Sequence, residues 1–551
     1  MFDVYAHNKI DNLIIKFFNT RLLILLGALI LPFFIMNSNK ISANIDPLIL
    51  YTIIAIGFLT GIFIFNKSAS NTLIPYLALQ MVLSAVFLDK KILSHFGFDL
   101  KLYGVVFVVA LFVVTYHLIK DIKYFWHNFP LFKFLFIYFI FIGIYLLFHH
   151  YSEFRLNNDL LSLKYALSLK VGGAGNAQTS REFGDLSQYV LLIEWLIPII
   201  SAAISLMVFK GLKTVREINN RLIKIIKYFS IILLIHFSLS AIASLLGFNP
   251  HFISIGAVND VDTAYFFPLF LFILIGFKYF LSNISTNENT KYLSIILNTT
   301  LAYLIIIIIF TGIIYQSGSA MTLGIIVGLS TIFFLTSSLG IELPLVFFKN
   351  NKNTASLKQK VTNTSIKERY TTNQLIKTTL FIAIVGISIA YFIGRMVNTF
   401  DSDLVSLGMR FDHWKDSYQS WVDSLDVFKL IFGYGLDTLR ETVYFASNSS
   451  AIEKGIVSPH NMFISLIYEQ GFVSFLYLAG IISTVITSFK YIKDKYQHTN
   501  LKIFSIINIA IVVAVFAMWN FADMPMISKI TFFCVLGFLE SIKFAYTTSE
   551  K

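Results

Sequence analysis

Charged residues are scarce in this chain, and cysteine is almost absent. Only 13% of the 551 residues are Asp, Glu, Lys or Arg, whereas 56% are hydrophobic, and the mean hydropathy is +0.73. This composition argues against a soluble protein, which needs more charge to cover its surface. The single cysteine, Cys534, excludes an intramolecular disulfide and a four-thiolate metal site.

Metal-ligand clusters and nucleic-acid motifs are also missing from the sequence. No loop carries His or Asp residues at the spacing of a metal site, so we expect metal-free chemistry and no cofactor. The net charge of +12 has a simpler origin than nucleic-acid binding. Basic residues between apolar segments orient a membrane protein and attract anionic lipid.

The chain does contain many apolar runs long enough to cross a bilayer, which requires roughly 20 residues of helix. They cover 22–36, 48–65, 72–88, 102–119, 131–148, 189–209, 228–247, 264–281, 293–314, 320–340, 376–394, 461–487, 503–519 and 527–545. The sequence therefore predicts an all-α, polytopic integral membrane protein with about 14 transmembrane helices. No cleavage site follows the first run, which indicates a signal anchor that is retained.

The basic residues predict an orientation. Six of them lie between two of the runs, whereas the loop 248–262 has no Lys or Arg. The six are Lys210, Lys213, Arg216, Arg221, Lys224 and Lys227. Because basic loops stay in the cytoplasm, we expect both termini to be cytoplasmic.

The runs and loops divide the chain into five parts. These are the N-terminal helices 1–148, an outer loop 149–188, central helices 189–348, a cytoplasmic basic loop 349–377, and C-terminal helices 378–545 that include a large outer loop 395–458. The basic loop has the composition of a disordered segment. The first outer loop ends in a Gly-rich stretch typical of a lid or a linker.

The large outer loop contains an amphipathic pattern. Aromatic and aliphatic residues recur at spacings of three and four, which predicts a helix along the membrane surface. They are Phe411, Trp414, Tyr418, Trp421 and Leu425. Arg410 stands at the start of this helix, where a guanidinium can bind either a pyrophosphate or lipid headgroups.

The most informative stretch is SPHNMFISLIYEQG, residues 458–471, where polar residues open an apolar helix. Ser458 is expected to cap the helix, which places His460 and Asn461 at the membrane boundary. Glu469 then lies about 13 Å deeper. His460 and Glu469 fall on opposite sides of the helix, so they cannot form one acid-base dyad.

The order of GMRFDHW, FGYGLDT and SPHNMFISLIYEQGFVSFL resembles the O-antigen ligase and polymerase superfamily of bacteria. That family combines an Arg-x-x-x-Trp helix, a Gly-x-Gly turn, and His-Asn followed by Glu-x-Gly. Upstream, GAVNDVDTAYFFPLF resembles its Asn-containing loop, and QSGSAMTLGIIVGL resembles its Ser-Arg-Gly turn. The resemblance covers roughly residues 250–490.

The resemblance implies a metal-independent, inverting glycosyltransferase in the bacterial inner membrane, with its active site facing the periplasm. The expected substrates are an undecaprenyl-pyrophosphate oligosaccharide and an acceptor glycan, and the expected partners are a chain-length regulator and a flippase. His460 would be the general base for the acceptor hydroxyl, and Arg410 would stabilise the pyrophosphate. For His460, hydrogen bonding to headgroups stays open as the alternative role.

The remaining motif residues receive roles on the same basis. Trp414 belongs to the Arg-x-x-x-Trp element and is assigned to substrate binding. Asn461 would orient His460 or the acceptor, or cap the helix, and Asn259 would contact sugar hydroxyls or cap the next helix. Four residues are assigned structural roles in turns or helix packing, namely Gly433, Gly435, Glu469 and Gly471.

The chain departs from the family pattern at one position. It has Gly318 where many members have the basic residue of Ser-Arg-Gly, so a second phosphate contact must come from elsewhere. Arg395 and Arg181 are the candidates.

The motif set is shared by several enzymes, and the acceptor cannot be read from it. We favour a polymerase of O-antigen or surface polysaccharide repeat units. The alternatives are a ligase that transfers the glycan to lipid A core or to protein, and a transporter of lipid-linked sugars. The absence of an internal repeat disfavours transport.

Overall fold

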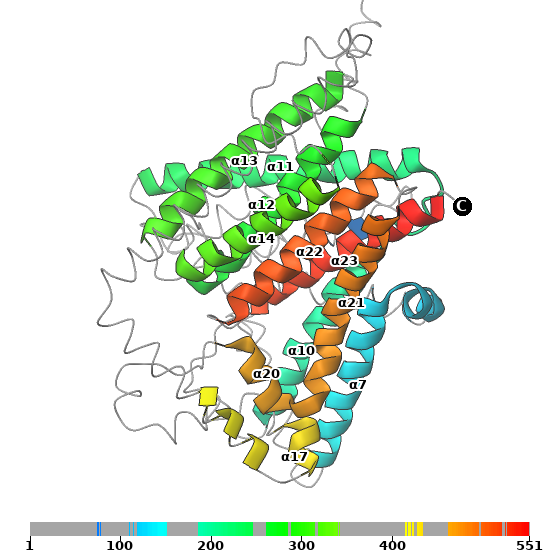
Figure 1. Cartoon of the computed structure of the whole chain (residues 1–551), viewed down its shortest axis with the longest axis vertical. Helices are drawn as coiled ribbons and strands as arrows, with labels where there is room; N and C mark the ends of the chain where they lie inside the picture. Colours follow the sequence, from blue (N-terminus) through cyan, green and yellow to red (C-terminus); the bar gives the residue numbers. More distant parts are fainter. Residues whose placement is uncertain are drawn as a thin grey trace, which may run out of the picture.

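The structure is a computed structural model, and every element that it describes is a helix (Figure 1). It describes residues 120–150, 186–245, 260–284, 288–314, 318–339, 427–433, 461–494, 498–520 and 526–549, with isolated residues in 74–78, 110–118, 341, 414–423 and 524. The predicted runs 22–36, 48–65 and 376–394 and the basic loop 349–377 lie outside this part.

The described part contains six helices long and apolar enough to cross a membrane, or seven if one bent pair is a single span. The prediction of an all-helical, multi-pass membrane protein is thus confirmed. The count of about 14 helices stays a prediction, because much of the N-terminal region lies outside the described residues.

The helices follow the apolar runs, with differences at their ends. In the first half they are α7 (Pro130–His150), α10 (Leu186–Leu206), α11 (Val215–Leu245), α12 (Asp260–Asn283), α13 (Glu288–Ile314) and α14 (Gly318–Ser338). In the second half they are α17 (Val427–Phe432), α20 (Met462–Gln470), the 3-10 helix η3 (Gly471–Val473), α21 (Ser474–Lys493), α22 (Thr499–Trp519) and α23 (Met526–Ser549).

Small residues allow the spans to pack closely. In Figure 1, α7, α10 and α21 run side by side, and α22 lies between α14 and α23. A Cβ on Gly537 of α23 would lie 2.5 Å from the carbonyl oxygen of Ala202 in α10. Within a bilayer, where burying apolar surface gives no advantage over lipid, such close van der Waals packing is what holds helices together.

α11 begins well before the apolar run that predicted it. Thr214 and Glu217 form a capping box: the Thr214 Oγ1 accepts from the Glu217 N–H at 3.2 Å, and the Glu217 carboxylate accepts from the N–H groups of Lys213 and Thr214. These backbone hydrogen bonds lower the pKa of Glu217. A polar helical start therefore extends α11 beyond the segment that hydropathy detects.

A polar network lies buried among α21, α22 and α23. Lys543 forms an ion pair with Glu540, and its Nζ also donates to the Ser488 Oγ at 2.7 Å. Asn508 of α22 donates to the Ser488 Oγ and to the Thr484 carbonyl, each at 3.0 Å. The side chains of Lys543 and Glu540 are only 1% and 7% exposed, so the pair is almost fully removed from solvent and lipid.

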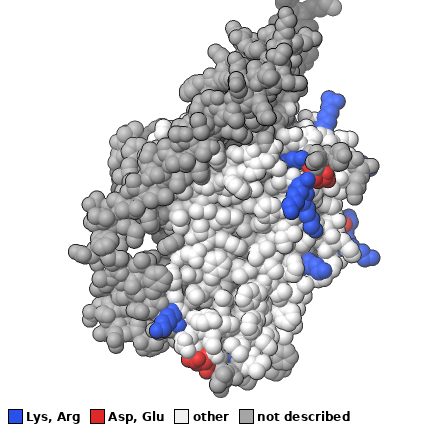
Figure 2. Space-filling model, in the orientation of Figure 1, with Lys and Arg blue, Asp and Glu red and all other residues white. Residues whose placement is uncertain are grey.

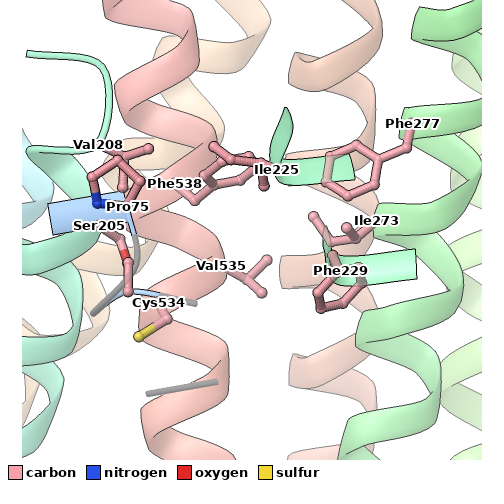
Figure 3. A pocket seen from close by; sticks show the side chains of 11 residues that line it. Pro75, Ser205, Val208, Ile225, Phe229, Ile273, Phe277, Cys534, Val535 and Phe538 are labelled. Atoms are coloured by element: carbon pink, nitrogen blue, oxygen red, sulfur yellow. The ribbon is translucent and has the colours of Figure 1, made fainter. Parts of the chain in front are cut away.

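An apolar pocket lies elsewhere in the bundle, between α10, α11, α12 and α23 (Figure 3). In that view Val535 points into the space between Ile273 and Ser205, and Cys534 lies on the same side as Ser205. No residue of α17, α20 or α21 lines this pocket. It is therefore separate from the segments that carry the Gly-x-Gly and Glu-x-Gly elements.

Candidate functional site

The reactive helix predicted from the sequence is described from Asn461 onward. Asn461 is the N-cap of α20: its backbone is extended, and its Oδ1 accepts hydrogen bonds from the N–H groups of Phe463 at 3.0 Å and Ile464 at 3.2 Å. The helix therefore begins at Met462. The sequence had suggested a start directly after Ser458. Asn and Ser are about equally good caps, and Asn461 is the one adjacent to the helical residues.

Aromatic contacts hold the start of α20 against the end of α22. The ring of Phe463 makes edge contacts with Phe516 and Trp519, at centroid distances of 5.5 and 5.4 Å. Trp519 is completely buried, and Met462 is 4% exposed. The position of the Asn461 cap is consequently fixed by a packed aromatic cluster.

The apolar run 461–487 is not one continuous helix, because the chain turns at Gly471. Gly471 has a φ of 55° and ends α20, and η3 and α21 follow it. Residues other than glycine rarely adopt this left-handed conformation. The α-helix predicted through this run is thus interrupted at that point, while Met462–Lys493 as a whole is one of the six candidate spans.

Gly471 meets a second glycine of the family-like pattern. Gly433, with a φ of 74°, follows α17. A Cβ on Gly471 would lie 2.7 Å from the backbone nitrogen of Gly433, and a Cβ on Gly433 would overlap the backbone of Glu469. The ends of α17 and α20 thus approach each other backbone to backbone, at a distance that only glycine allows.

The segment that precedes α17 is attached to α20 by Trp421. Its indole Nε1 donates to the Lys429 carbonyl at 3.2 Å, its ring makes an edge contact with Phe472, and it packs with the buried Tyr468. The aromatic side chains of the predicted surface helix thus differ in their surroundings. Trp421 is 6% exposed and faces protein, Tyr418 is 52% exposed, and Trp414 is partly buried.

The buried polar residue of α20 is Gln470, which the sequence analysis missed. The Tyr138 hydroxyl of α7 donates to the Gln470 Oε1, and Gln470 is completely buried. Glu469 is only partly buried, whereas the sequence had placed it deep in the membrane. The sequence does contain a signal for this burial. Met462, Leu466 and Gln470 follow one another at spacings of four residues, which places Gln470 on the buried face.

The structure describes only part of the predicted site. It brings Gly433, Glu469 and Gly471 together at one end of α20, with Asn461 at the other end. Trp414 is also described and is partly buried. Six predicted site residues lie outside the described part of the chain, namely His460, Arg410, Arg395, Arg181, Asn259 and Gly435.

Within the described residues, no group of three or more His, Cys, Asp or Glu side chains could hold a metal ion. Comparison of the chain with models of known protein families finds no match, and comparison with curated proteins finds none either. The functional assignment consequently rests on the motifs and on the geometry described above.

Replacing either glycine by alanine should destabilise the protein. We expect Gly433→Ala and Gly471→Ala each to cost about 2–5 kcal/mol, because left-handed strain costs roughly 1–2 kcal/mol and overpacking roughly 1–3 kcal/mol. The measurement is the thermal unfolding midpoint of each purified variant in detergent.

Substitutions at two other glycines distinguish the cost of left-handed backbone strain from the cost of steric overlap. Gly211 has a φ of 80° but no atom within 4 Å of a Cβ, so Gly211→Ala should show the strain alone. Gly143 lies in α7, also with open space, and Gly143→Ala should be neutral or slightly stabilising. Wild-type midpoints for Gly433→Ala and Gly471→Ala would contradict the close approach of the two backbones.

Proposed function

We propose that this chain is an inverting, metal-independent glycosyltransferase that polymerises undecaprenyl-pyrophosphate-linked repeat units of O-antigen or surface polysaccharide, at the outer face of the bacterial inner membrane. The observation that supports it most is the contact between Gly433 and Gly471. These residues belong to the Gly-x-Gly and Glu-x-Gly elements, which are distant in the sequence. Their meeting is what a shared site for the family-like motifs requires.

The proposed reaction needs one base and two cations. The acceptor hydroxyl oxygen attacks the anomeric carbon of the donor sugar, and the bond from that carbon to the pyrophosphate oxygen breaks. His460 takes the hydroxyl proton, since a histidine side chain is suited to general-base catalysis near neutral pH. Arg410 neutralises the charge that develops on the departing undecaprenyl pyrophosphate, and Arg395 or Arg181 supplies the second cation.

Asn461 contributes to this proposal through the helix start. Its Oδ1 is engaged by two backbone N–H groups, so its side-chain NH₂ is the group left to contact His460 or the acceptor. Because Phe463 packs on Trp519, the cap is held in place by the bundle. His460 is the residue that directly precedes this fixed point in the sequence.

The glycan profile of a strain that lacks the protein tests the proposal. We expect lipopolysaccharide with a single repeat unit on its core, because each unit is still made and ligated but is not extended. Gel electrophoresis of the lipopolysaccharide gives the result directly, and restoring the gene should restore the ladder of bands.

Three other results would point away from a polymerase. A bare core would indicate the ligase that transfers the whole glycan. Accumulation of lipid-linked units on the inner leaflet would indicate a transporter. An unchanged ladder would leave the proposed reaction without support in that strain.

A further inference from the structure

A short basic helix, Lys120–Asn128, lies across the end of the bundle. It precedes α7 in the chain and is bent by 113° relative to the α7 segment Pro130–Tyr145. Proline is favoured at the first position of a helix, and Pro130 begins α7 at this bend. In Figure 1 it is the blue helix to the side of the upper end of α7.

One face of this helix is held firmly by the bundle. Asp121 forms an ion pair with Lys210, whose Nζ lies 5.0 Å from the ring centroid of Tyr124. Phe125 is fully buried, and Tyr124 makes an edge contact with Phe544 of α23. These contacts fix both the position and the rotation of the helix.

The opposite face is cationic and open. Lys120, Lys123 and His127 are exposed, and their spacing of three and four places them on one side of the helix. Among the residues that the structure describes, neither Lys120 nor Lys123 forms an ion pair. Figure 2 shows that Lys and Arg gather at this end of the visible face, whereas the middle of the face is nearly free of charge.

Next to this face, the side chains along one side of α7 change from apolar to cationic. Ile140, Phe141 and Ile144 are 40–42% exposed and form an apolar stripe. Lys133 lies seven residues before Ile140, on the same side of the helix, and its Nζ is 5.3 Å from the ring centroid of Trp126. A change from apolar side chains to lysine and tryptophan is typical of the boundary between hydrocarbon and headgroups.

We propose that Lys120, Lys123 and Lys133 form a binding site for the headgroup of an anionic phospholipid. The helix Lys120–Asn128 lies in the plane of the headgroups, with Ile122 and Trp126 directed toward the acyl chains. The lysines neutralise the lipid phosphate, while the pairing of Asp121 with Lys210 removes the nearest negative charge. This site is independent of the proposed glycosyl transfer.

Lipid titration of the purified full-length protein tests the site. Short-chain phosphatidylglycerol added to the detergent-solubilised protein should raise its thermal unfolding midpoint, and the concentration for half of the effect gives an apparent affinity. The variant with Lys120→Gln, Lys123→Gln and Lys133→Gln should lose about a hundredfold in this affinity, because each lysine contributes roughly fivefold near an anionic surface.

The matched control removes three exposed lysines, one just before α11 and two within it. A variant with Lys213→Gln, Lys224→Gln and Lys227→Gln has the same net charge and should bind the lipid within about twofold of wild type. If Lys133→Gln lowers the midpoint without lipid, the Lys120→Gln, Lys123→Gln double variant takes its place, since both side chains are exposed. Equal losses in the two sets of variants, equal stabilisation by phosphatidylcholine, or equal stabilisation by inorganic phosphate would each overturn the site.

Discussion

A His460→Ala variant is expected to polymerise repeat units about a hundredfold to ten-thousandfold more slowly than wild type, with protein level and membrane insertion unchanged. Removal of a general base costs this much when the acceptor hydroxyl must lose its proton in the transition state. The measurement is the rate of polymer formation by purified protein from a lipid-linked repeat unit. In cells, the glycan chain-length distribution should shift to single units.

Arg410→Lys tests whether the Arg410 guanidinium binds the pyrophosphate in the same mechanism. Lysine keeps the charge but lacks the planar fork that binds two phosphate oxygens, so a large loss of rate would indicate a pyrophosphate contact. Lys415→Gln is the control, because this exposed residue lies in the same loop and has no proposed role. Wild-type polymer from both His460→Ala and Arg410→Lys, at normal protein level, would refute the assigned roles.

Lys543→Met is expected to give the largest loss of stability, about 3–5 kcal/mol, because it leaves the Glu540 carboxylate buried without its partner. It also removes a donor from the Ser488 Oγ. The thermal unfolding midpoint in detergent should fall accordingly. Lys490→Met is the control, since Lys490 is exposed at the end of α21.

Combining Lys543→Met with Glu540→Gln completes the test. The double variant should recover part of the lost stability, because no unpaired charge remains in the bundle. The difference between the double variant and the sum of the single variants measures the coupling within the pair. Strict additivity would show that the two side chains act independently, contrary to the network among α21, α22 and α23.

Much of the membrane fold could be predicted from the apolar runs, because a bilayer requires long uninterrupted helices. The run 503–519 corresponds closely to α22 (Thr499–Trp519). Hydropathy does not detect helical segments that consist of polar residues. It missed the first turns of α11, which the Thr214 and Glu217 capping box begins, and it passed over Lys543 and Glu540, whose charges are diluted within an apolar window.

The candidate site was harder to predict, since its geometry depends on the backbone. The sequence indicated a turn at Gly433 and only a structural role for Gly471. It did not indicate that the two would touch, because that contact joins distant segments. The cap at Asn461 and the burial of Gln470 depend on where α20 begins and ends. In one long helix that began after Ser458, Glu469 would have been the deep polar group, whereas in the structure it is only partly buried.

The contact between Gly433 and Gly471 also closes the intervening chain into a loop whose two ends are fixed in space. The entropy of closing such a loop rises only with the logarithm of its length, by about 0.6 kcal/mol for each doubling. Once the ends are fixed, insertions between them change stability little. A change in the length of the chain between Gly433 and Asn461 should therefore leave the geometry at the start of α20 largely unchanged.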